Sequence, residues 1–281
     1  MTTSAATSLA GCLYIVATPI GNAADLTYRA HTILQQVDYI LAEDTRHSRP
    51  LLKAYNIQTP VQSLHEHNEA QKSTEIIAHL LKGCHYALIS DAGTPLISDP
   101  GFHLVKSARE AGIAVVPIPG ACAIIAALCA SGLPCDTFLF TGFLPAKPLA
   151  RHNKLKSLEK TQTTVLYEST HRIHACIEDI RQIYGEHYQF VLAKELTKKF
   201  EHFKHGTADD LLTWLNHSSS AAKGEFVLIL PAQAAKPTPS TSQALLAVLL
   251  AELPLKQAVK IASLYTKEPK NQLYELALKL K

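Results

Sequence analysis

The residues at 90–101, SDAGTPLISDPG, combine two glycines, two prolines and two aspartates in a single turn. The turn directly follows a short apolar run, YALI, that is typical of a buried strand. Gly93 and Gly101 can adopt positive φ or let a ligand contact bare backbone, and Pro95 and Pro100 restrict the chain beside them. Because ligands of α/β proteins bind at the carboxyl ends of strands, the turn predicts a ligand site. The alternative is a tight turn with a purely structural role.

The sequence contains no GxGxxG, and no GxxxxGK followed by Ser or Thr, so the usual dinucleotide and nucleoside-triphosphate fingerprints are missing. No glycine turn is followed by a lysine that would grasp phosphate, which favours a ligand held through adenine, ribose and backbone contacts. His65 and His67 in HEHNE could suggest metal ligation. Alternating histidines in a loop lack a third spaced ligand, however, and we expect no metal site.

The elements that would position these residues follow an α/β pattern. Short apolar runs alternate with helical stretches in the first half of the chain, which predicts parallel βαβ units. The expected strands there are 13–18, 39–43, 86–90 and 113–118, and the expected helices include 68–82, closed by Gly83. In the second half we expect strands at 138–143, 165–169, 188–196, 200–206 and 224–230, with helices at 170–184 and 207–216. Since no helix separates Leu196 from Phe200, this second sheet is expected to be mixed.

We expect the chain to be divided into four parts. These are an N-terminal α/β domain at 1–131, a second α/β domain at 132–231, a linker at 232–243 and a basic module at 244–281. The linker is assigned because PAQAAKPTPSTSQ is rich in Pro, Ser, Thr and Ala and lacks apolar periodicity. The last part predicts two short helices joined by the turn TKEPKN, a helix-turn-helix-like shape used on nucleic acids or for packing alone.

Composition favours an intracellular protein. The six cysteines form no CxxC pair, which is typical of reduced thiols, and no secretory signal is evident, so we expect a cytoplasmic location. The uncharged segment at 111–135 is long enough to cross a bilayer, but Pro117, Pro119 and Gly120 split it into a strand, a loop and a short helix. The net charge of +3 is mild, whereas lysines and arginines cluster at 147–160 and 256–281, as in solvated helix faces or nucleic-acid contacts.

Six motifs in order carry a resemblance to a known family. They are TPIGN at 18–22, AEDTR at 42–46, HEHNE at 65–69, SDAGTPLISDPG at 90–101, GFLPAK at 142–147 and YESTHR at 167–172. Together these resemble ribosomal RNA small subunit methyltransferase I, of the tetrapyrrole methylase superfamily. The likeness extends over essentially the whole chain, including AKELTK, KGEFVLI and the terminal LPLKQAVKIASLYTKEPKNQLYELAL.

The resemblance implies a fold of two α/β lobes of the tetrapyrrole methylase type, a class III S-adenosylmethionine methyltransferase, with a small C-terminal helical module. It implies that S-adenosyl-L-methionine binds in the cleft between the lobes and that the protein forms a homodimer. The cofactor contacts carried over are Pro19, Gly93, Thr94, Pro95, Ile97, Ala121, Cys122, Leu166, Tyr167, Ala193, Glu225 and Phe226. The family usually has proline before TPIGN and PGPSA in place of PGACA, so Cys122 replaces a hydroxyl. The lost contact would weaken cofactor binding by about 1 kcal/mol.

The implied reaction is 2′-O-methylation of a cytidine in the decoding region of 16S ribosomal RNA, within the small subunit. A ribose hydroxyl is a very weak acid, so a base or a cation beside it would assist. The candidates are Glu43, Asp44, Arg46, His65, His67, Glu168 and Lys194. Glu43 and Asp44 follow a strand and would lie at the sheet's carboxyl edge; alternatively they cap a helix beginning near Arg46 and bind that arginine.

Basic side chains would bind the phosphates of the RNA backbone, so the affinity for RNA would decrease with increasing salt. The residues assigned to it are Lys147, Arg151, Arg172, Lys256, Lys260 and Lys270. Tyr167 could stack on a base or pack the cleft. Three alternative functions remain open at this point: methylation of a tetrapyrrole carbon, RNA binding without catalysis, and nicotinamide-dependent oxidation.

Overall fold

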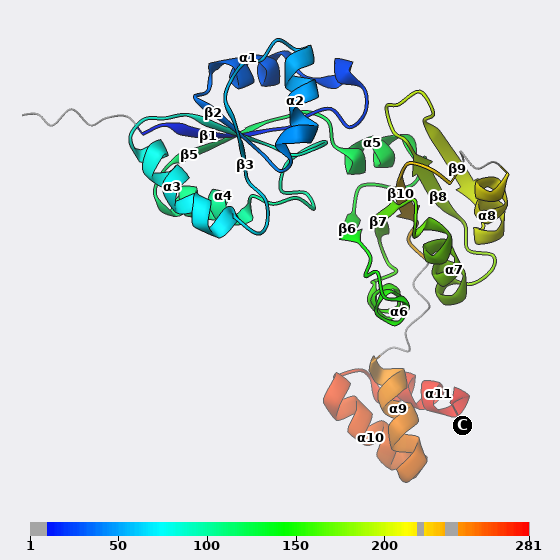
Figure 1. Cartoon of the computed structure of the whole chain (residues 1–281). Coiled ribbons are helices and arrows are strands. Elements are labelled where there is room, and N and C mark those ends of the chain that lie inside the picture. The colour runs from blue at the N-terminus through cyan, green and yellow to red at the C-terminus, as the bar shows by residue number, and fades with distance from the viewer. Residues whose placement is uncertain (1–9, 218–221, 234–240, 281) are drawn as a thin grey trace, which may run out of the picture. The chain divides into compact units, whose positions relative to one another are not determined.

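The computed structural model describes residues 10–217, 222–233 and 241–280. The chain divides into two compact units, Met1–Ala232 and Gln233–Lys281. The first unit contains two five-stranded sheets with helices packed on them (Figure 1). The strands of the two sheets fall on either side of the domain boundary expected after residue 131, between β5 and β6.

The first sheet is entirely parallel, as the alternating pattern predicted, and has the strand order β3-β2-β4-β1-β5. The short strand β3 was not among the strands expected from the sequence. One hydrophobic cluster packs α1 and α2 against one face, and another packs α3 and α4 against the opposite face (Figure 1). The strands are β1 (Cys12–Val16), β2 (Tyr39–Ala42), β3 (Val61–Ser63), β4 (Tyr86–Ile89) and β5 (Ala114–Ile118). The helices are α1 (Tyr28–Gln36), α2 (Thr45–Ala54), α3 (Glu69–Leu81) and α4 (Phe102–Glu110), with a 3-10 turn, η1, at Ala23–Asp25.

The second sheet is mixed, as predicted, with the order β6-β7-β10-β8-β9, and only β6 and β7 pair in parallel. Its strands are β6 (Phe138–Phe143), β7 (Thr163–Ser169), β8 (Phe190–Lys194), β9 (His202–Gly206) and β10 (Glu225–Leu230). One face is covered by α6 (Pro148–Ser157), α7 (Ile173–Tyr184) and α8 (Ala208–Asn216). The other face packs against α5 (Ala123–Ala130), through Ile124, Ala127 and Leu128.

The uncharged segment at 111–135 thus forms β5, a loop and the eight-residue helix α5, as its prolines predicted. Across the three described ranges, no helix has the length and apolar character needed to cross a membrane.

The described residues of the second unit form three helices, α9 (Thr241–Glu252), α10 (Leu255–Thr266) and α11 (Lys270–Lys279). Its core includes Leu246 on α9, Val259 on α10 and Leu273 on α11. The two helices expected on either side of the TKEPKN turn are α10 and α11, whereas α9 was missed and begins inside the linker expected at 232–243. The sequence TSQALLAVLLAE has apolar residues on all sides, so it lacks the one-sided periodicity that reveals a helix. Residues 234–240 of that expected linker lie outside the described residues.

Candidate functional site

Three loops meet at the carboxyl edge of the first sheet. The loop after β4 pairs with the segment after β1, because the backbone N–H of Thr18 donates to the Gly93 carbonyl (2.9 Å) and that of Gly93 donates to the Thr18 carbonyl (3.1 Å). Thr94 Oγ1 donates to the carbonyl of Ala121 (3.0 Å), which follows β5. The turn singled out in the sequence therefore joins the loops after three neighbouring strands.

The loop after β4 stores backbone strain. Gly93 and Gly101 have φ of 84° and 128°, and Leu96 and Ser98 both have φ of 71°, a region that side chains disfavour. A Cβ on Gly93 would lie 3.2 Å from Cγ2 of Ile20. Strain of this kind persists where the surroundings enforce it and is concentrated at functional sites.

A cavity of about 470 Å³ opens beside this loop. Its walls come from the loop after β4, the N-terminus of α5, the ends of β6 and β7, and the start of β10. The residues lining it are Ile20, Asp91–Thr94, Ile97–Asp99, Cys122, Ala123, Phe143, Tyr167–His171, Leu196 and Gly224–Val227. Four of these carry carboxylates (Asp91, Asp99, Glu168 and Glu225), and no lysine or arginine is among the described lining residues. The cavity therefore suits a ligand with an apolar body and a positive charge.

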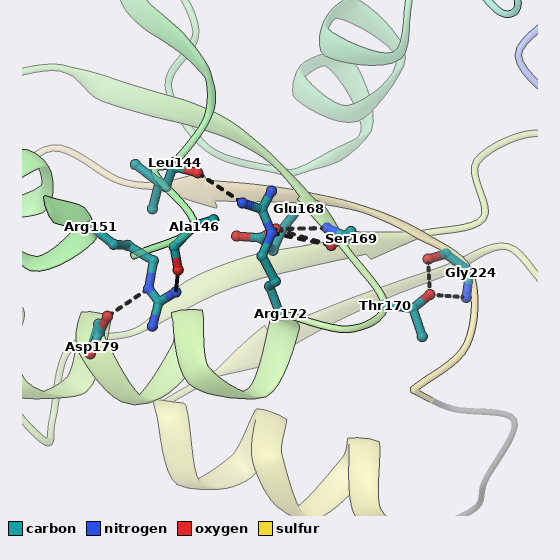
Figure 2. A network of polar contacts seen from close by, with 9 residues as sticks. All are labelled: Leu144, Ala146, Arg151, Glu168, Ser169, Thr170, Arg172, Asp179 and Gly224. Carbon is teal, nitrogen blue, oxygen red and sulfur yellow. Dashed lines mark hydrogen bonds and ion pairs between the residues drawn. The ribbon is translucent and has the colours of Figure 1, made fainter. Parts of the chain in front are cut away.

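Thr170 clamps one wall of the cavity. Its Oγ1 donates to the Gly224 carbonyl (2.7 Å) and accepts from the Gly224 N–H (2.9 Å), which joins the turn after β7 to the start of β10 (Figure 2). Both residues line the cavity. A single hydroxyl thus holds two segments of the wall together.

The turn after β7 is also held in place by the buried carboxylate of Glu168. Glu168 Oε1 accepts from the Ser169 N–H (2.8 Å) and lies 2.9 Å from Arg172 Nε (Figure 2). Arg172 Nη1 donates to the Leu144 carbonyl (3.1 Å), in the loop after β6. Glu168 Oε2 is buried and has no hydrogen-bond partner within the described part of the chain.

Carboxylates cluster next to the cavity. The backbone N–H of Asp44 donates to Asp91 Oδ1 (3.2 Å). Burial raises the pKa of Asp99 to about 6, and the nearby carboxylates of Glu43 and Asp91 add to the rise. Burial also raises the pKa of Glu43. Hydrogen bonds from Arg46 lower the pKa of Asp44 to about 2, so carboxylates with different proton affinities lie in one cluster.

His65 is held in one tautomer by Asn68. Asn68 Oδ1 accepts from the backbone N–H of His65 (2.9 Å), which orients the amide so that its Nδ2 donates to His65 Nε2 (3.0 Å). With Nε2 accepting, the hydrogen-bond network assigns the proton of the neutral ring to Nδ1. Nδ1 is buried and has no hydrogen-bond partner among the residues described. In this arrangement the Nδ1–H of His65 is a buried donor without an acceptor among the described residues.

The expected cofactor residues fall into two groups. Those that line the cavity are Gly93, Thr94, Ile97, Cys122, Tyr167, Glu225 and Phe226. Those that do not are Pro19, Pro95, Ala121, Leu166 and Ala193, of which Leu166 and Ala193 are fully buried in the cores of the second lobe.

Among the expected catalytic residues, Glu168 lines the cavity and the others do not, although Glu43, Asp44, Arg46 and His65 belong to or adjoin its carboxylate cluster. Asp44 does cap α2, because its Oδ1 accepts from the Arg46 N–H (2.8 Å), as the structural alternative required.

The catalytic prediction for Lys194 is wrong. Its neighbour Ala193 packs on the cavity side of the second sheet, so the Lys194 side chain points to the other face, where Nζ lies 5.9 Å from the Trp214 ring centroid. Burial lowers the pKa of Lys194. Asp91, Asp99 and Thr170, which do line the cavity, were missed although SDAGTPLISDPG and YESTHR contain them.

The expected RNA contacts differ in availability. Lys147 is exposed at the start of α6, and Lys256, Lys260 and Lys270 are exposed in the second unit.

Arg151 is instead buried and pairs with Asp179 at 2.6 Å (Figure 2), so its predicted phosphate contact is wrong. Arg172 is half-buried in the pairing with Glu168 described above. No group of three or more His, Cys, Asp or Glu side chains in the described ranges is arranged to hold a metal ion.

The comparisons with known proteins agree with each other. Residues 12–212 match the family described as Tetrapyrrole (Corrin/Porphyrin) Methylases, and residues 237–281 match the RsmI C-terminal HTH domain. The chain is 50% identical over 278 residues to the ribosomal RNA small subunit methyltransferase I of Haemophilus influenzae, covering 97% of this chain and 98% of that protein. It is also 50% identical over 271 residues to the protein of that name from Escherichia coli O157:H7, covering 95% of each.

Solved structures share the fold at low sequence identity. Uroporphyrin-III-C-methyltransferase from Thermus thermophilus aligns with a TM-score of 0.57 at 21% identity, over 79% of this chain and 94% of that one. Diphthine synthase aligns with a TM-score of 0.60 at 13% identity, over 79% of this chain and 90% of that one. At these identities the likeness concerns the architecture alone.

Proposed function

Because this chain belongs to the ribosomal RNA small subunit methyltransferase I family of tetrapyrrole methylases, we propose that it methylates ribosomal RNA with S-adenosyl-L-methionine. More finely, we propose that it methylates the 2′-hydroxyl of a cytidine in the decoding region of 16S ribosomal RNA, in the small subunit. We also propose a homodimer that acts in the cytoplasm. The observation that carries the proposal is the 470 Å³ cavity lined by four carboxylates at the ends of the strands.

The residues of the cavity fit this cofactor. Gly93 leaves bare backbone where a Cβ would crowd Ile20, and Ile97, Leu196 and Val227 offer apolar contact to an adenine ring. Asp91 and Asp99 favour a cation in the same space, whereas Glu225 is already paired with Lys198 at 2.9 Å. The other cofactor residues expected from the sequence remain part of this proposal, with backbone contacts for those whose side chains are buried.

When bound, S-adenosyl-L-methionine supplies a methyl group on a positively charged sulfur, an activated electrophile. The chain must then hold the acceptor ribose in line and assist loss of its proton. We propose that Asp99 and Glu43 accept a hydrogen bond from that hydroxyl, since they are carboxylates beside the cavity whose proton affinities burial raises. His65, Arg46 and Asp44 position this edge of the site, because Asn68 orients the His65 ring and Arg46 donates to Asp44.

The test uses small ribosomal subunits that lack the modification. The full chain is incubated with them and with methyl-labelled S-adenosyl-L-methionine, and the digested RNA is separated into nucleosides. We expect label in 2′-O-methylcytidine. Label on a base would contradict the 2′-O assignment, and label in a porphyrin precursor but not in RNA would contradict the proposed substrate altogether.

A further inference from the structure

Helix α2 begins at the edge of the carboxylate cluster. Asp44, its N-cap, is joined through its backbone N–H to Asp91, which lines the cavity. At about 1.5 Å per residue, Lys53 lies about 13 Å along α2 from Asp44. A ligand that extends from the cavity mouth along this helix would therefore pass the side chains that α2 exposes.

The exposed side of α2 is cationic. Arg46, Arg49 and Lys53 have the spacing i, i+3, i+7, which places them on one side of the helix, while Ser48 and Leu52 face the core. Arg46 is paired with Asp44 at 2.8 Å. Within the described part of the chain, Arg49 and Lys53 have neither an ion pair nor a side-chain hydrogen bond, so both can bind an external anion.

A second hollow, of about 540 Å³, lies at the end of this row of cations. Its polar lining residues are Arg49, Lys53, Asn56, Gln58 and Thr59. The remaining lining residues are apolar, and no Asp or Glu occurs among those described. The Thr59 hydroxyl donates to the Leu34 carbonyl (2.6 Å), so the groups open to a ligand are two cations and two amides beside a small apolar surface. These groups match a phosphate, a sugar and a base edge.

We propose that this hollow binds a nucleotide of the RNA strand flanking the methylated residue, with Arg49 and Lys53 on the phosphates at its two sides. The proposal rests on the proposed function. None of the residues that line this hollow was assigned to RNA in the sequence analysis. At a rise of about 3.4 Å per stacked nucleotide, the distance along α2 corresponds to about three or four nucleotides from the target ribose. Asn56 and Gln58 supply the amide groups that read a base or sugar.

The test compares RNA binding by the full chain and by the double variant Arg49→Ala, Lys53→Ala over a range of salt concentrations. A small-subunit RNA fragment carrying the target site serves as the probe. Each phosphate contact on a single strand contributes about 0.7 to the magnitude of the slope of log affinity against log salt. Loss of two contacts therefore lowers that magnitude by about 1.4 and weakens binding about tenfold at physiological salt. Binding of S-adenosyl-L-methionine stays as in the wild type.

The matched control is Lys82→Ala, an exposed lysine that follows α3 on the opposite face of the same sheet, which leaves the slope unchanged. Should the double variant unfold, Arg49→Gln and Lys53→Gln singly each lower the slope by about 0.7. A slope equal to the wild type's overturns the inference, and so does an equal loss with Lys82→Ala. A wild-type protein that binds RNA through these cations but methylates none would contradict the proposed function and leave the hollow's role intact.

Discussion

Replacing Thr170 with valine tests the wall of the cavity most sharply. Valine keeps the branched shape of threonine but removes the hydroxyl that both donates to and accepts from Gly224. A fully buried polar group left unpaired costs about 1–3 kcal/mol. Because Thr170 and Gly224 are half-buried, water replaces part of each lost hydrogen bond, which leaves about 1–2 kcal/mol for the pair.

That loss loosens the two wall segments, so we expect the dissociation constant for S-adenosyl-L-methionine to rise about 5- to 30-fold in Thr170→Val. Calorimetric titration of the full chain measures it. Thr170→Ser keeps the hydroxyl and restores most of the affinity. Thr161→Val is the matched control, since it removes only an exposed hydrogen bond to Glu159. Equal affinities of Thr170→Val and wild type, with both folded, would refute the reasoning.

Three further predictions concern buried charges. The pKa of Asp99, about 6, lies above the ordinary aspartate value of 3.8, so its contribution to stability is complete below about pH 3.8 and is lost as the pH rises through 6. Asp99→Asn should therefore melt at a higher temperature than wild type at pH 8 and not at pH 4, while binding S-adenosyl-L-methionine more weakly at pH 8. Arg151→Met leaves Asp179 without its partner and should lower the free energy of unfolding by about 3 kcal/mol in urea titrations, with no change in the salt dependence of RNA binding. Lys194→Met should leave kcat and its pH profile unchanged, because the side chain packs on Trp214 away from the cavity; a lost limb of the pH profile would argue for a catalytic role.

Local sequence signals predicted the described strands except β3, and the loop beside the cavity. Short apolar runs flanked by glycine and proline give both the strands and the loops that line the cavity, so the place of SDAGTPLISDPG beside a cavity could be predicted from residues 90–101. Helix α9 was missed because its apolar residues surround it, and only its packing in a three-helix unit explains them.

The availability of side chains could not be predicted in the same way. Arg151 belongs to a basic run in the sequence, yet Asp179 lies 28 residues away and becomes its partner only when α6 packs on α7. Asp99 and Thr170 were passed over within recognised motifs, because their burial and their contacts depend on which loops meet in the fold.

The proposed function requires that the cavity be the cofactor site, and blocking the cavity is the most direct test. Ala123 lines the cavity at the start of α5, so Ala123→Trp fills the space, whereas Ile125→Trp on the same helix changes only an exposed side chain. The measurement is calorimetric binding of S-adenosyl-L-methionine to the two folded variants and the wild type. We predict one cofactor per chain for wild type and Ile125→Trp and no binding to Ala123→Trp. Undiminished binding to Ala123→Trp would contradict the assignment of the cavity.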